Sequence, residues 1–252
     1  MIYFASDFHL GSPNLTDSKK REGLICRWLD SISSDAKDIY LLGDVFDFWF
    51  EYKKVVPKGN IRFLGKLAEL TDRGIRIHLC VGNHDLWIRD YFKEEINIRI
   101  FTKPEILLLN NKKIYIHHGD GLGPGDYGYK FIKGIFLNPI CQKLFSWLHP
   151  DIALGIAEKL SKSSRKNTNP KEKKYLGDKK EYLTLYSEEI LQTEQIDYFI
   201  FGHRHLQLDI LLSNNQSRYI NLGDWYKSPK FAKFNGETVE LKDVNSQLTS
   251  HL

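Results

Sequence analysis

The stretch IRIHLCVGNHD, residues 75–85, decides the fold, because an apolar run with strand character ends abruptly in polar side chains that can bind metals. The same arrangement recurs at four other places in the chain. The five clusters are Asp7-Phe8-His9, Gly43-Asp44, Gly82-Asn83-His84-Asp85, His117-His118-Gly119-Asp120 and Gly202-His203-Arg204-His205. Each cluster is common by itself, but the whole series predicts one metal site built from loops at the ends of strands.

The apolar periodicity predicts alternating strands and helices in the first half of the chain and mostly strands near its end. We expect strands at residues 2–6, 39–42, 75–81, 106–109, 113–116, 196–201, 208–212, 219–222 and 238–241, and helices at 18–32 and 61–70. Asn110-Asn111 predicts a hairpin turn. This layout indicates an α/β fold of two packed sheets with helices outside, and places the polar clusters at one edge.

Residues 127–194 differ in character from the rest of the chain. They carry an apolar stripe at helical spacing, interrupted at Asn138-Pro139 and formed by Phe131, Ile132, Ile135, Phe136, Ile140, Leu144, Phe145 and Leu148. Residues 159–180 then hold nine basic and two acidic side chains. We expect a single domain over 1–252 with a helical cap inserted at about residues 127–194. The stripe either lines a groove for acyl chains or simply packs on the sheet, and both remain open.

Bulk composition limits the function classes. The chain has 252 residues with 42% hydrophobic side chains, enough for a sizeable core, and a net charge of +4 that is weak support for nucleic-acid binding. Its three cysteines are far apart and indicate a reducing compartment. The chain starts directly with a strand-like run, and no apolar run approaches the ~18 residues that span a bilayer. We therefore expect a cytoplasmic protein.

The spacing of the polar residues predicts how two ions are shared. Side chains at i and i+2 of an extended chain point the same way, so Asp7 and His9 can hold one ion, and His203 and His205 repeat this spacing. Asp44 has two oxygens and is the expected shared ligand. The predicted sets are Asp7, His9, Asp44 and His205 for one ion and Asp44, Asn83, His118 and His203 for the other. Oxygen and imidazole ligands without thiolate favour Mn²⁺, with iron and zinc left open.

His84 is the expected catalytic imidazole. Next to the metals, it can protonate a leaving oxygen or stabilise charge on phosphate, with Asp85 as the carboxylate that orients it. The alternative is a structural histidine bonded within its loop. The favoured role of both Asp85 and Asp120, however, is to fix the tautomers of metal ligands, and one of His117-His118 is expected to face the metals.

In this order, the clusters resemble the calcineurin-like metallophosphoesterase superfamily over residues 7–205. The resemblance implies a four-layer α/β/β/α sandwich with a dinuclear centre. Within the superfamily, the chain is similar to the UDP-2,3-diacylglucosamine pyrophosphohydrolases of lipid A biosynthesis. The shared features are LGDVFDFW at 42–49, His118-Gly119-Asp120 followed by Asp126 and Gly128-Tyr129, a cap containing Ser163-Ser164, and Gly223-Asp224-Trp225. His84 departs from the family, many members of which carry arginine at this position.

The resemblance implies a metal-dependent hydrolase that cleaves the pyrophosphate of UDP-2,3-diacylglucosamine to UMP and 2,3-diacylglucosamine 1-phosphate. It implies two divalent ions, with Mn²⁺ expected. The implied substrate contacts are Asn83, His84, Asp126, Tyr129, Ser164, Lys171 and His203, while Thr168 departs from the usual asparagine. The expected partners are the UDP-linked acylated sugar and the cytoplasmic face of the inner membrane, where the enzyme is peripheral, and no nucleic acid is expected. The oligomeric state stays open.

Other functions share the same metal site. A nucleotide phosphodiesterase, a protein phosphatase and a nuclease differ from the lipid enzyme only in the cap. A nuclease needs a longer basic groove with stacking aromatics, whereas the basic residues here are concentrated at 159–180. A non-catalytic scaffold is the alternative of another class; it can afford to lose ligands, and none is missing here.

Overall fold

The computed structural model describes the chain except residues 124–126, 168–174, 176, 178–179 and 250–252, and the side chains of 162–167 are also outside the description. Two sheets face each other. The first has the order β11-β10-β1-β2-β3-β4, with β1 to β4 parallel and β10 antiparallel to β1. Its strands are β1 (Ile2–Ala5), β2 (Asp38–Leu42), β3 (Arg76–Cys80), β4 (Arg99–Phe101), β10 (Lys230–Phe234) and β11 (Val239–Asp243).

The second sheet has the order β5-β6-β7-β9-β8. Its strands are β5 (Glu105–Leu109), β6 (Lys112–Ile116), β7 (Tyr198–Phe201), β8 (Gln207–Leu211) and β9 (Arg218–Leu222). The hairpin predicted at Asn110-Asn111 joins β5 to β6, and both asparagines have a positive φ, of 47° and 64°. A two-residue turn with positive φ at both positions matches the twist of the paired strands.

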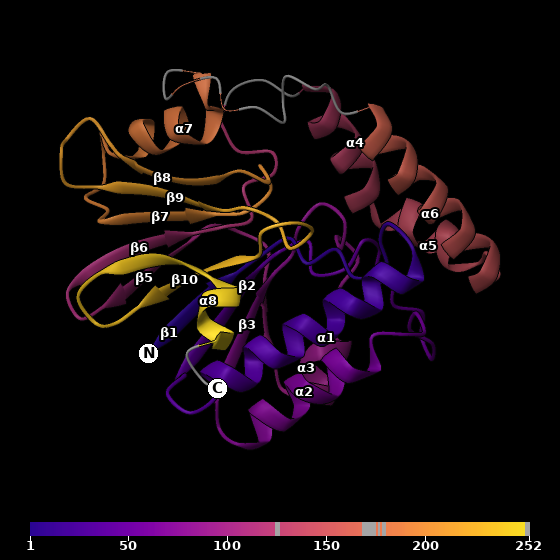
Figure 1. The fold of residues 1–252 in the computed structure, drawn as a ribbon. Coiled ribbons are helices and arrows are strands. Elements are labelled where there is room, and N and C mark those ends of the chain that lie inside the picture. The colour runs from indigo at the N-terminus through magenta and orange to yellow at the C-terminus, as the bar shows by residue number, and fades with distance from the viewer. Residues whose placement is uncertain (124–126, 168–174, 176, 178–179, 250–252) are drawn as a thin grey trace.

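Helices cover the outer face of each sheet (Figure 1). The first sheet packs against α1 (Leu15–Ile32), α2 (Ile61–Asp72), α3 (Tyr91–Ile96) and α8 (Val244–Thr249), and the second against α7 (Tyr182–Ile190). A third apolar cluster lies between the sheets, with Phe4, Leu42 and Ile116 among its members. The predicted four-layer α/β/β/α sandwich is confirmed.

The structure differs from the sequence prediction mainly at short elements. Helix α1 begins at Leu15 rather than residue 18, because the side chain of Asn14 accepts a hydrogen bond from the backbone N–H of Asp17 and caps the helix. The periodicity did not indicate β4 or α3, because three strand residues or six helix residues are too few to show a period, and it also did not indicate the five-residue strand β10.

A separate group of helices, α4 (Tyr127–Leu137), α5 (Pro139–Ser146) and α6 (Pro150–Asn167), stands beside the sandwich, and we call it the helical segment (Figure 1). The break expected at Asn138-Pro139 separates α4 from α5, and the Asn138 side chain caps α5. Helix α7 falls within the range expected for the cap, but Leu183 packs in the core of the second sheet. Among the described residues, no helix has the length and apolarity needed to cross a membrane.

Candidate metal centre

Five loops meet at one edge of the sandwich because the strands that precede them are paired in a register that brings their C-terminal ends to the same edge. In the first sheet, Ala5 pairs with Leu41, and Leu42 pairs with Cys80. In the second, Ile116 pairs with Ile200. The loops that follow β1, β2, β3, β6 and β7 carry the five clusters singled out in the sequence. The parallel strands therefore bring side chains from distant parts of the chain to one place.

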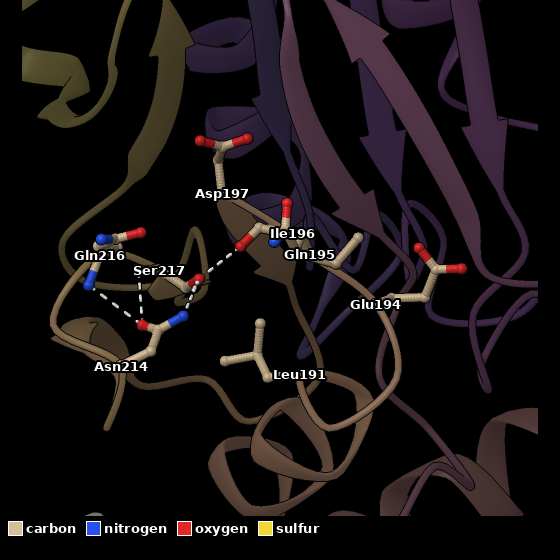
Figure 2. A pocket seen from close by; sticks show the side chains of 8 residues that line it. All are labelled: Leu191, Glu194, Gln195, Ile196, Asp197, Asn214, Gln216 and Ser217. Atoms are coloured by element: carbon tan, nitrogen blue, oxygen red, sulfur yellow. Dashed lines mark hydrogen bonds between the residues drawn. The ribbon is translucent and has the colours of Figure 1, made fainter.

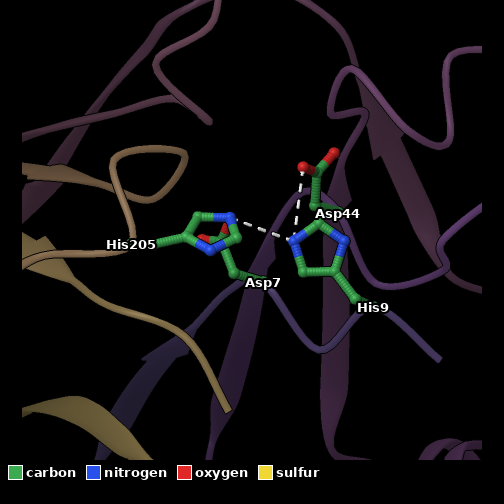
Figure 3. Close-up of side chains that lie close together, drawn as sticks. All are labelled: Asp7, His9, Asp44 and His205. Carbon is green, nitrogen blue, oxygen red and sulfur yellow. Dashed lines mark hydrogen bonds and ion pairs between the residues drawn. The ribbon is translucent and has the colours of Figure 1, made fainter. Parts of the chain in front are cut away.

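The first group of ligand-type atoms comes from Asp7, His9, Asp44 and His205 (Figure 3). The Nε2 atoms of His9 and His205 are 3.1 Å apart. His9 Nε2 lies 3.7 Å from both Asp7 Oδ1 and Asp44 Oδ2, and His205 Nε2 lies 3.3 Å from Asp7 Oδ1. Three of these side chains are buried, while that of His205 is 37% exposed.

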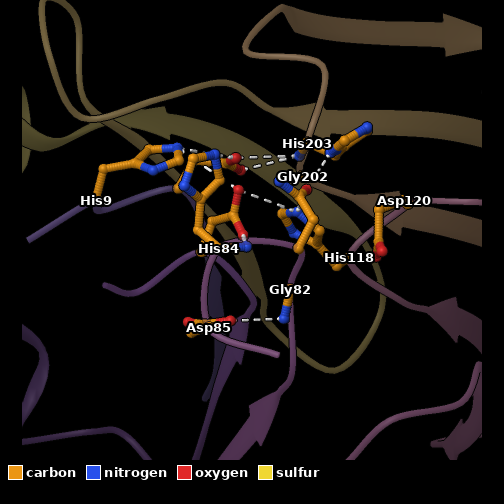
Figure 4. A network of polar contacts seen from close by, with 12 residues as sticks. His9, Gly82, His84, Asp85, His118, Asp120, Gly202 and His203 are labelled. Carbon is orange, nitrogen blue, oxygen red and sulfur yellow. Dashed lines mark hydrogen bonds and ion pairs between the residues drawn. The ribbon is translucent and has the colours of Figure 1, made fainter. Parts of the chain in front are cut away.

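The second group lies beside the first (Figure 4). Asn83 Oδ1 is 3.0 Å from His118 Nε2 and 2.7 Å from His203 Nδ1. Asp44 Oδ2 is 3.4 Å from His118 Nε2 and 3.7 Å from His9 Nε2. One oxygen of Asp44 therefore faces both groups, the position a bridging ligand requires.

The donor atoms fit divalent cations. Ligands about 2.1 Å from an ion in octahedral geometry lie roughly 3 Å from one another, and the separations here run from 2.7 to 3.7 Å. The Nε2 atoms of His9 and His205 face each other at 3.1 Å, close enough that both could hold one divalent cation. The donors are oxygens and imidazole nitrogens without sulfur, a set that suits Mn²⁺ and similar ions.

Contacts behind the candidate ligands select which ring nitrogen faces the centre. His118 Nδ1 donates to the carbonyl oxygen of Leu42 at 2.8 Å, so Nε2 is left for a cation. His205 Nδ1 lies 3.4 Å from Asp224 Oδ2. Asp224 stood out in the sequence only as part of Gly223-Asp224-Trp225. Its contact with His205 could not be predicted, because the two residues are 19 positions apart and meet only through β8 and β9.

Several candidate ligands have a left-handed backbone conformation, which is unfavourable for a non-glycine residue and must be stabilised by tertiary contacts. The φ angles of Asp7, His9, Asp44, His203 and His205 are 56°, 44°, 51°, 66° and 54°. Each non-glycine residue in this region costs on the order of 1–3 kcal/mol. Arg21 of α1 stabilises the first loop, since its buried guanidinium donates to the carbonyls of Phe8 at 2.6 Å and His9 at 2.7 Å. Sequence reasoning missed Arg21, although four residues separate it from buried Ile25 and place both on one helix face.

Two glycines are required by the close approach of these loops. A Cβ at Gly82 would overlap the Asp44 carboxylate, and a Cβ at Gly202 would overlap the Asp7 carboxylate. Neither neighbour can move, because both carboxylates are buried in the centre. The glycines at 82 and 202 are therefore as necessary to the centre as the ligand-type residues beside them.

The charges of the centre call for a cation. Burial by itself lowers the pKa of His118, but the charge of Asp44 outweighs it and raises the pKa to about 10. The pKa of His205 also rises to about 10, against burial, through its contacts with Asp224 and Asp7. At His9 and His203, by contrast, burial prevails and lowers their pKa values. The buried carboxylates thus favour positive charge beside them, which a bound divalent cation would supply.

Asp85 has a different position from the one expected. It is fully buried, and its oxygens accept the backbone N–H groups of Gly82 at 2.7 Å and Val45 at 2.8 Å (Figure 4). Burial raises the pKa of Asp85 to about 7, and the charge of Asp44 acts in the same direction. Both expectations for Asp85, that it orients His84 and that it fixes the tautomer of a ligand, are corrected. Its hydrogen bonds go to backbone N–H groups, and they tie together the loops that carry Asp44 and Asn83.

His84 instead contacts the loop after β2 and helix α6. Its Nδ1 lies 3.0 Å from the carbonyl oxygen of Asp47 and 3.4 Å from Ser161 Oγ. Its ring centroid is 4.9 Å from that of His9, so the imidazole stands at the edge of the first group.

The loop after β6 also connects the centre to the helical segment. His117 Nδ1 accepts the N–H of Gly119, which leaves His118 as the member of the pair that faces the centre. Asp120 accepts hydrogen bonds from Tyr129 Oη and Lys133 Nζ of α4, both at 2.5 Å. Asp120 therefore anchors α4, whereas the sequence suggested that it would fix a ligand tautomer.

The predicted substrate contacts are only partly visible. The ring of Tyr129 lies 6.4 Å from that of His203, next to the second group. Asp126, Thr168 and Lys171 lie outside the described residues, and Ser164 lies in α6 with its side chain outside the description.

A pocket of about 430 Å³ lies at the opposite end of β7 (Figure 2). It is lined by Leu191, Glu194, Gln195, Ile196, Asp197, Asn214, Gln216 and Ser217. Its polar groups bond one another: Ser217 Oγ donates to the Ile196 carbonyl, and Asn214 Oδ1 accepts the N–H of Ser217. Because it lies before the start of β7 and the metal centre lies after its end, the pocket is separate from the centre.

Comparison with known proteins agrees with this geometry. The profile of the calcineurin-like phosphoesterase family matches residues 1–207. UDP-2,3-diacylglucosamine hydrolase of Porphyromonas gingivalis is 35% identical, over 96% of this chain and 97% of the relative. The protein of the same name from Haemophilus influenzae is 27% identical, over 90% and 91%. A solved phosphoesterase, Yfce from E. coli, aligns with a TM-score of 0.47 at 15% identity, over 98% and 94%.

Proposed function

Because this chain belongs to the calcineurin-like phosphoesterase family, we propose that its centre serves a hydrolase of UDP-2,3-diacylglucosamine, giving UMP and 2,3-diacylglucosamine 1-phosphate. The observation that carries the proposal is Asp44 Oδ2, which faces both ligand groups and so suits a two-metal centre. The choice of substrate comes from relatives of that name, which align over nearly the whole chain.

The residues proposed to hold the ions are those of the two groups. Asp7, His9, Asp44 and His205 take one ion, and Asp44, Asn83, His118 and His203 take the other. Two divalent ions bound there, for which we propose Mn²⁺, lower the pKa of water and offset negative charge on phosphate oxygens.

His84 is proposed to act on the substrate phosphate. A carbonyl oxygen can only accept a hydrogen bond, so the 3.0 Å contact with Asp47 places a proton on His84 Nδ1. Nε2 is therefore the ring nitrogen that can contact a phosphate oxygen or deliver a proton to the leaving group. Histidine at this position can both carry a proton and transfer it, which arginine, with its fixed charge, cannot do.

The helical segment is proposed as the cap of a single domain and as the site of the acyl chains. If the apolar stripe only packed on the sheet, its side chains would be buried, but Phe131 is 72% and Trp147 74% exposed. The other exposed apolar residues of the segment are Ile132, Ile135, Leu137, Ile140, Leu144, Leu148, Ile152, Ile156 and Leu160. Few of the large apolar side chains described in these helices point towards the sandwich; Phe145, which contacts Phe50, is one of them.

So large an exposed apolar surface beside a phosphoesterase centre suits a substrate with acyl chains and attachment to a lipid surface. We propose that the enzyme works on the cytoplasmic face of the inner membrane, where the basic residues of 159–180 meet anionic headgroups. We also propose substrate contacts at Tyr129, Asn83, His84 and His203. Asp126, Ser164 and Lys171, whose side chains lie outside the described residues, are proposed contacts on the family resemblance alone.

Mass spectrometry of the products from a panel of UDP-sugars with and without acyl chains, in the presence of Mn²⁺, tests the proposal. We expect UMP and the sugar 1-phosphate from the diacylated substrate, with little turnover of UDP-N-acetylglucosamine. Cleavage of unacylated nucleotides alone would overturn the lipid substrate and leave the hydrolase. Failure to cleave even a chromogenic phosphodiester at any metal concentration would favour the scaffold.

A further inference from the structure

Helix α6 of the helical segment reaches the proposed catalytic histidine. Ser161 is only 8% exposed, and its Oγ donates to Asp47 Oδ2 at 3.0 Å. The same Oγ lies 3.4 Å from His84 Nδ1. Asp47, on the loop after β2, thus contacts Ser161 through its carboxylate and His84 through its carbonyl oxygen.

Hydrogen-bond roles in this trio follow from the chemistry of each group. The carboxylate of Asp47 can only accept, so the hydroxyl proton of Ser161 is directed to it. The lone pairs of Ser161 Oγ then face His84 Nδ1, whose proton lies between this oxygen and the Asp47 carbonyl. Both neighbours of Nδ1 are acceptors, and they favour one tautomer and one orientation of the ring.

We propose that Ser161 is a positioning residue for His84, so that the helical segment takes part in catalysis besides binding lipid. The hydroxyl, held by Asp47, keeps the imidazole turned with Nδ1–H inward and Nε2 towards the phosphate. This inference rests on the proposed function only in assigning His84 to the phosphate.

The helical segment is anchored firmly enough to place Ser161. Trp87 Nε1 donates to the carbonyl of Phe136 in α4 at 2.7 Å, and the Trp87 ring lies 4.6 Å from that of Phe145 in α5. Arg89 donates to Gln142 at 2.7 Å. Trp87 and Arg89 follow His84 closely in the chain, so the loop that carries the histidine and the segment that carries the serine are fastened to each other.

Steady-state kinetics of Ser161→Ala, with both a chromogenic phosphodiester and the acylated substrate, test the proposal. We expect kcat to fall about tenfold with KM nearly unchanged. This is the smaller end of the activity loss, about 10- to 100-fold, that follows removal of a group that orients a residue of a metal site. Ser161→Thr keeps the hydroxyl and should restore kcat. Ser146→Ala, which removes a hydroxyl bonded only within α5, is the matched control and should behave as wild type. An unchanged kcat in Ser161→Ala would overturn the proposal.

A double-mutant cycle separates positioning from general packing. In a His84→Ala background, Ser161→Ala should cost nothing further, because the group it orients is gone. An equal loss in both backgrounds would overturn the proposal in favour of a structural role.

A spectroscopic readout does not depend on turnover. In ¹⁵N-labelled protein loaded with Mg²⁺, long-range ¹H–¹⁵N spectra should show His84 protonated at Nδ1, and Ser161→Ala should change that pattern while Ser161→Thr keeps it. A pattern insensitive to both would refute the inference. If the acylated substrate is not cleaved but the diester is, the proposed substrate fails while these measurements still decide the role of Ser161.

Discussion

At the scale of single residues, the centre depends on side chains whose position is set by strained backbone and close glycines. Asp44 illustrates this dependence. It adopts a φ of 51°, accepts the N–H of His84 at Oδ1, and presents Oδ2 to both ligand groups. Burial by itself raises its pKa, but the charges of His118 and His84 hold it well below the usual range, so Asp44 stays an anion able to bridge cations.

Asp44→Asn should lose most of the bound metal, because an amide has one oxygen and no charge to share between two ions. We expect elemental analysis to give fewer than one ion per chain after dialysis, and turnover to fall by about 10³-fold or more. Asp30→Asn, which alters an exposed carboxylate of α1, is the control and should keep metal and activity. Full metal content in Asp44→Asn would contradict its bridging position.

Arg21→Met should destabilise the first loop. It removes the donors for the carbonyls of Phe8 and His9 and the cation that lies 4.4 Å from the centre of the Tyr226 ring. Leaving buried carbonyls unsatisfied costs about 1–3 kcal/mol each. We expect a lower free energy of unfolding in urea and weaker metal binding by calorimetry, with Arg27→Met on the exposed side of α1 as the control. Metal affinity equal to wild type would show that the loop keeps its shape without Arg21.

At the scale of elements, the strands that deliver the ligands are joined at their other ends by ion pairs. Asp38 at the start of β2 accepts two hydrogen bonds from Arg76 of β3, both at 2.7 Å, and one from His78 at 2.9 Å. Burial by itself raises the pKa of Asp38, but hydrogen bonds from His78 and Arg76 hold it well below its usual range. This cluster helps to keep β2 and β3 in register.

Asp38→Asn should therefore cost stability in a pH-dependent way. A carboxylate with a depressed pKa in the folded state stabilises the protein above its unfolded pKa of about 3.9, and this contribution is lost as the pH falls below it. We expect a loss of about 1–2 kcal/mol at pH 7, moderated by the exposure of Arg76, that shrinks towards pH 2.5 in urea unfolding. Asp72→Asn, at the exposed end of α2, is the control. A loss of the same size at both pH values would contradict the ion-pair explanation.

At the scale of the whole molecule, the helical segment combines an exposed apolar surface with direct contacts to the metal loops. Asp120 fastens it through Lys133, and Asp47 through Ser161. Most of the large apolar side chains in the described part of the same helices face outward. The arrangement places an exposed apolar surface, which we propose binds lipid, beside the candidate metal centre.

Replacing Phe131 and Trp147 together by serine should weaken attachment to lipid without disturbing the centre. Both side chains are more than 70% exposed, so their loss removes little buried area from the fold. We expect less co-sedimentation with vesicles of phosphatidylethanolamine and phosphatidylglycerol and a higher KM for the acylated substrate, with unchanged turnover of a soluble diester. Leu211→Ser, an exposed apolar change on β8, is the control. Equal loss of both activities would make these residues structural.

Features that depend on residues close together in the chain could be predicted from the sequence, whereas features that depend on contacts between distant residues could not. Most strand positions and the hairpin at Asn110-Asn111 follow from local periodicity and turn chemistry and were predicted, whereas β4 and β10 were not. The place of α7 was not, because an apolar helix face does not say which sheet it covers. The predicted link between Asp85 and His84 was wrong because neighbours in a loop can point to opposite sides, here towards Gly82 and towards Asp47.

By itself, the sequence determined the family, the sandwich of two sheets and the set of ligand-type residues. It could do so because each cluster consists of a few consecutive residues at the end of a strand. Only the tertiary structure decided what stands behind those residues: Arg21 under the first loop, Asp224 behind His205, and Ser161 beside His84. These contacts join groups that are far apart in the chain. Their existence depends on how helices and loops pack around the sheets, and no local pattern of residues encodes that packing.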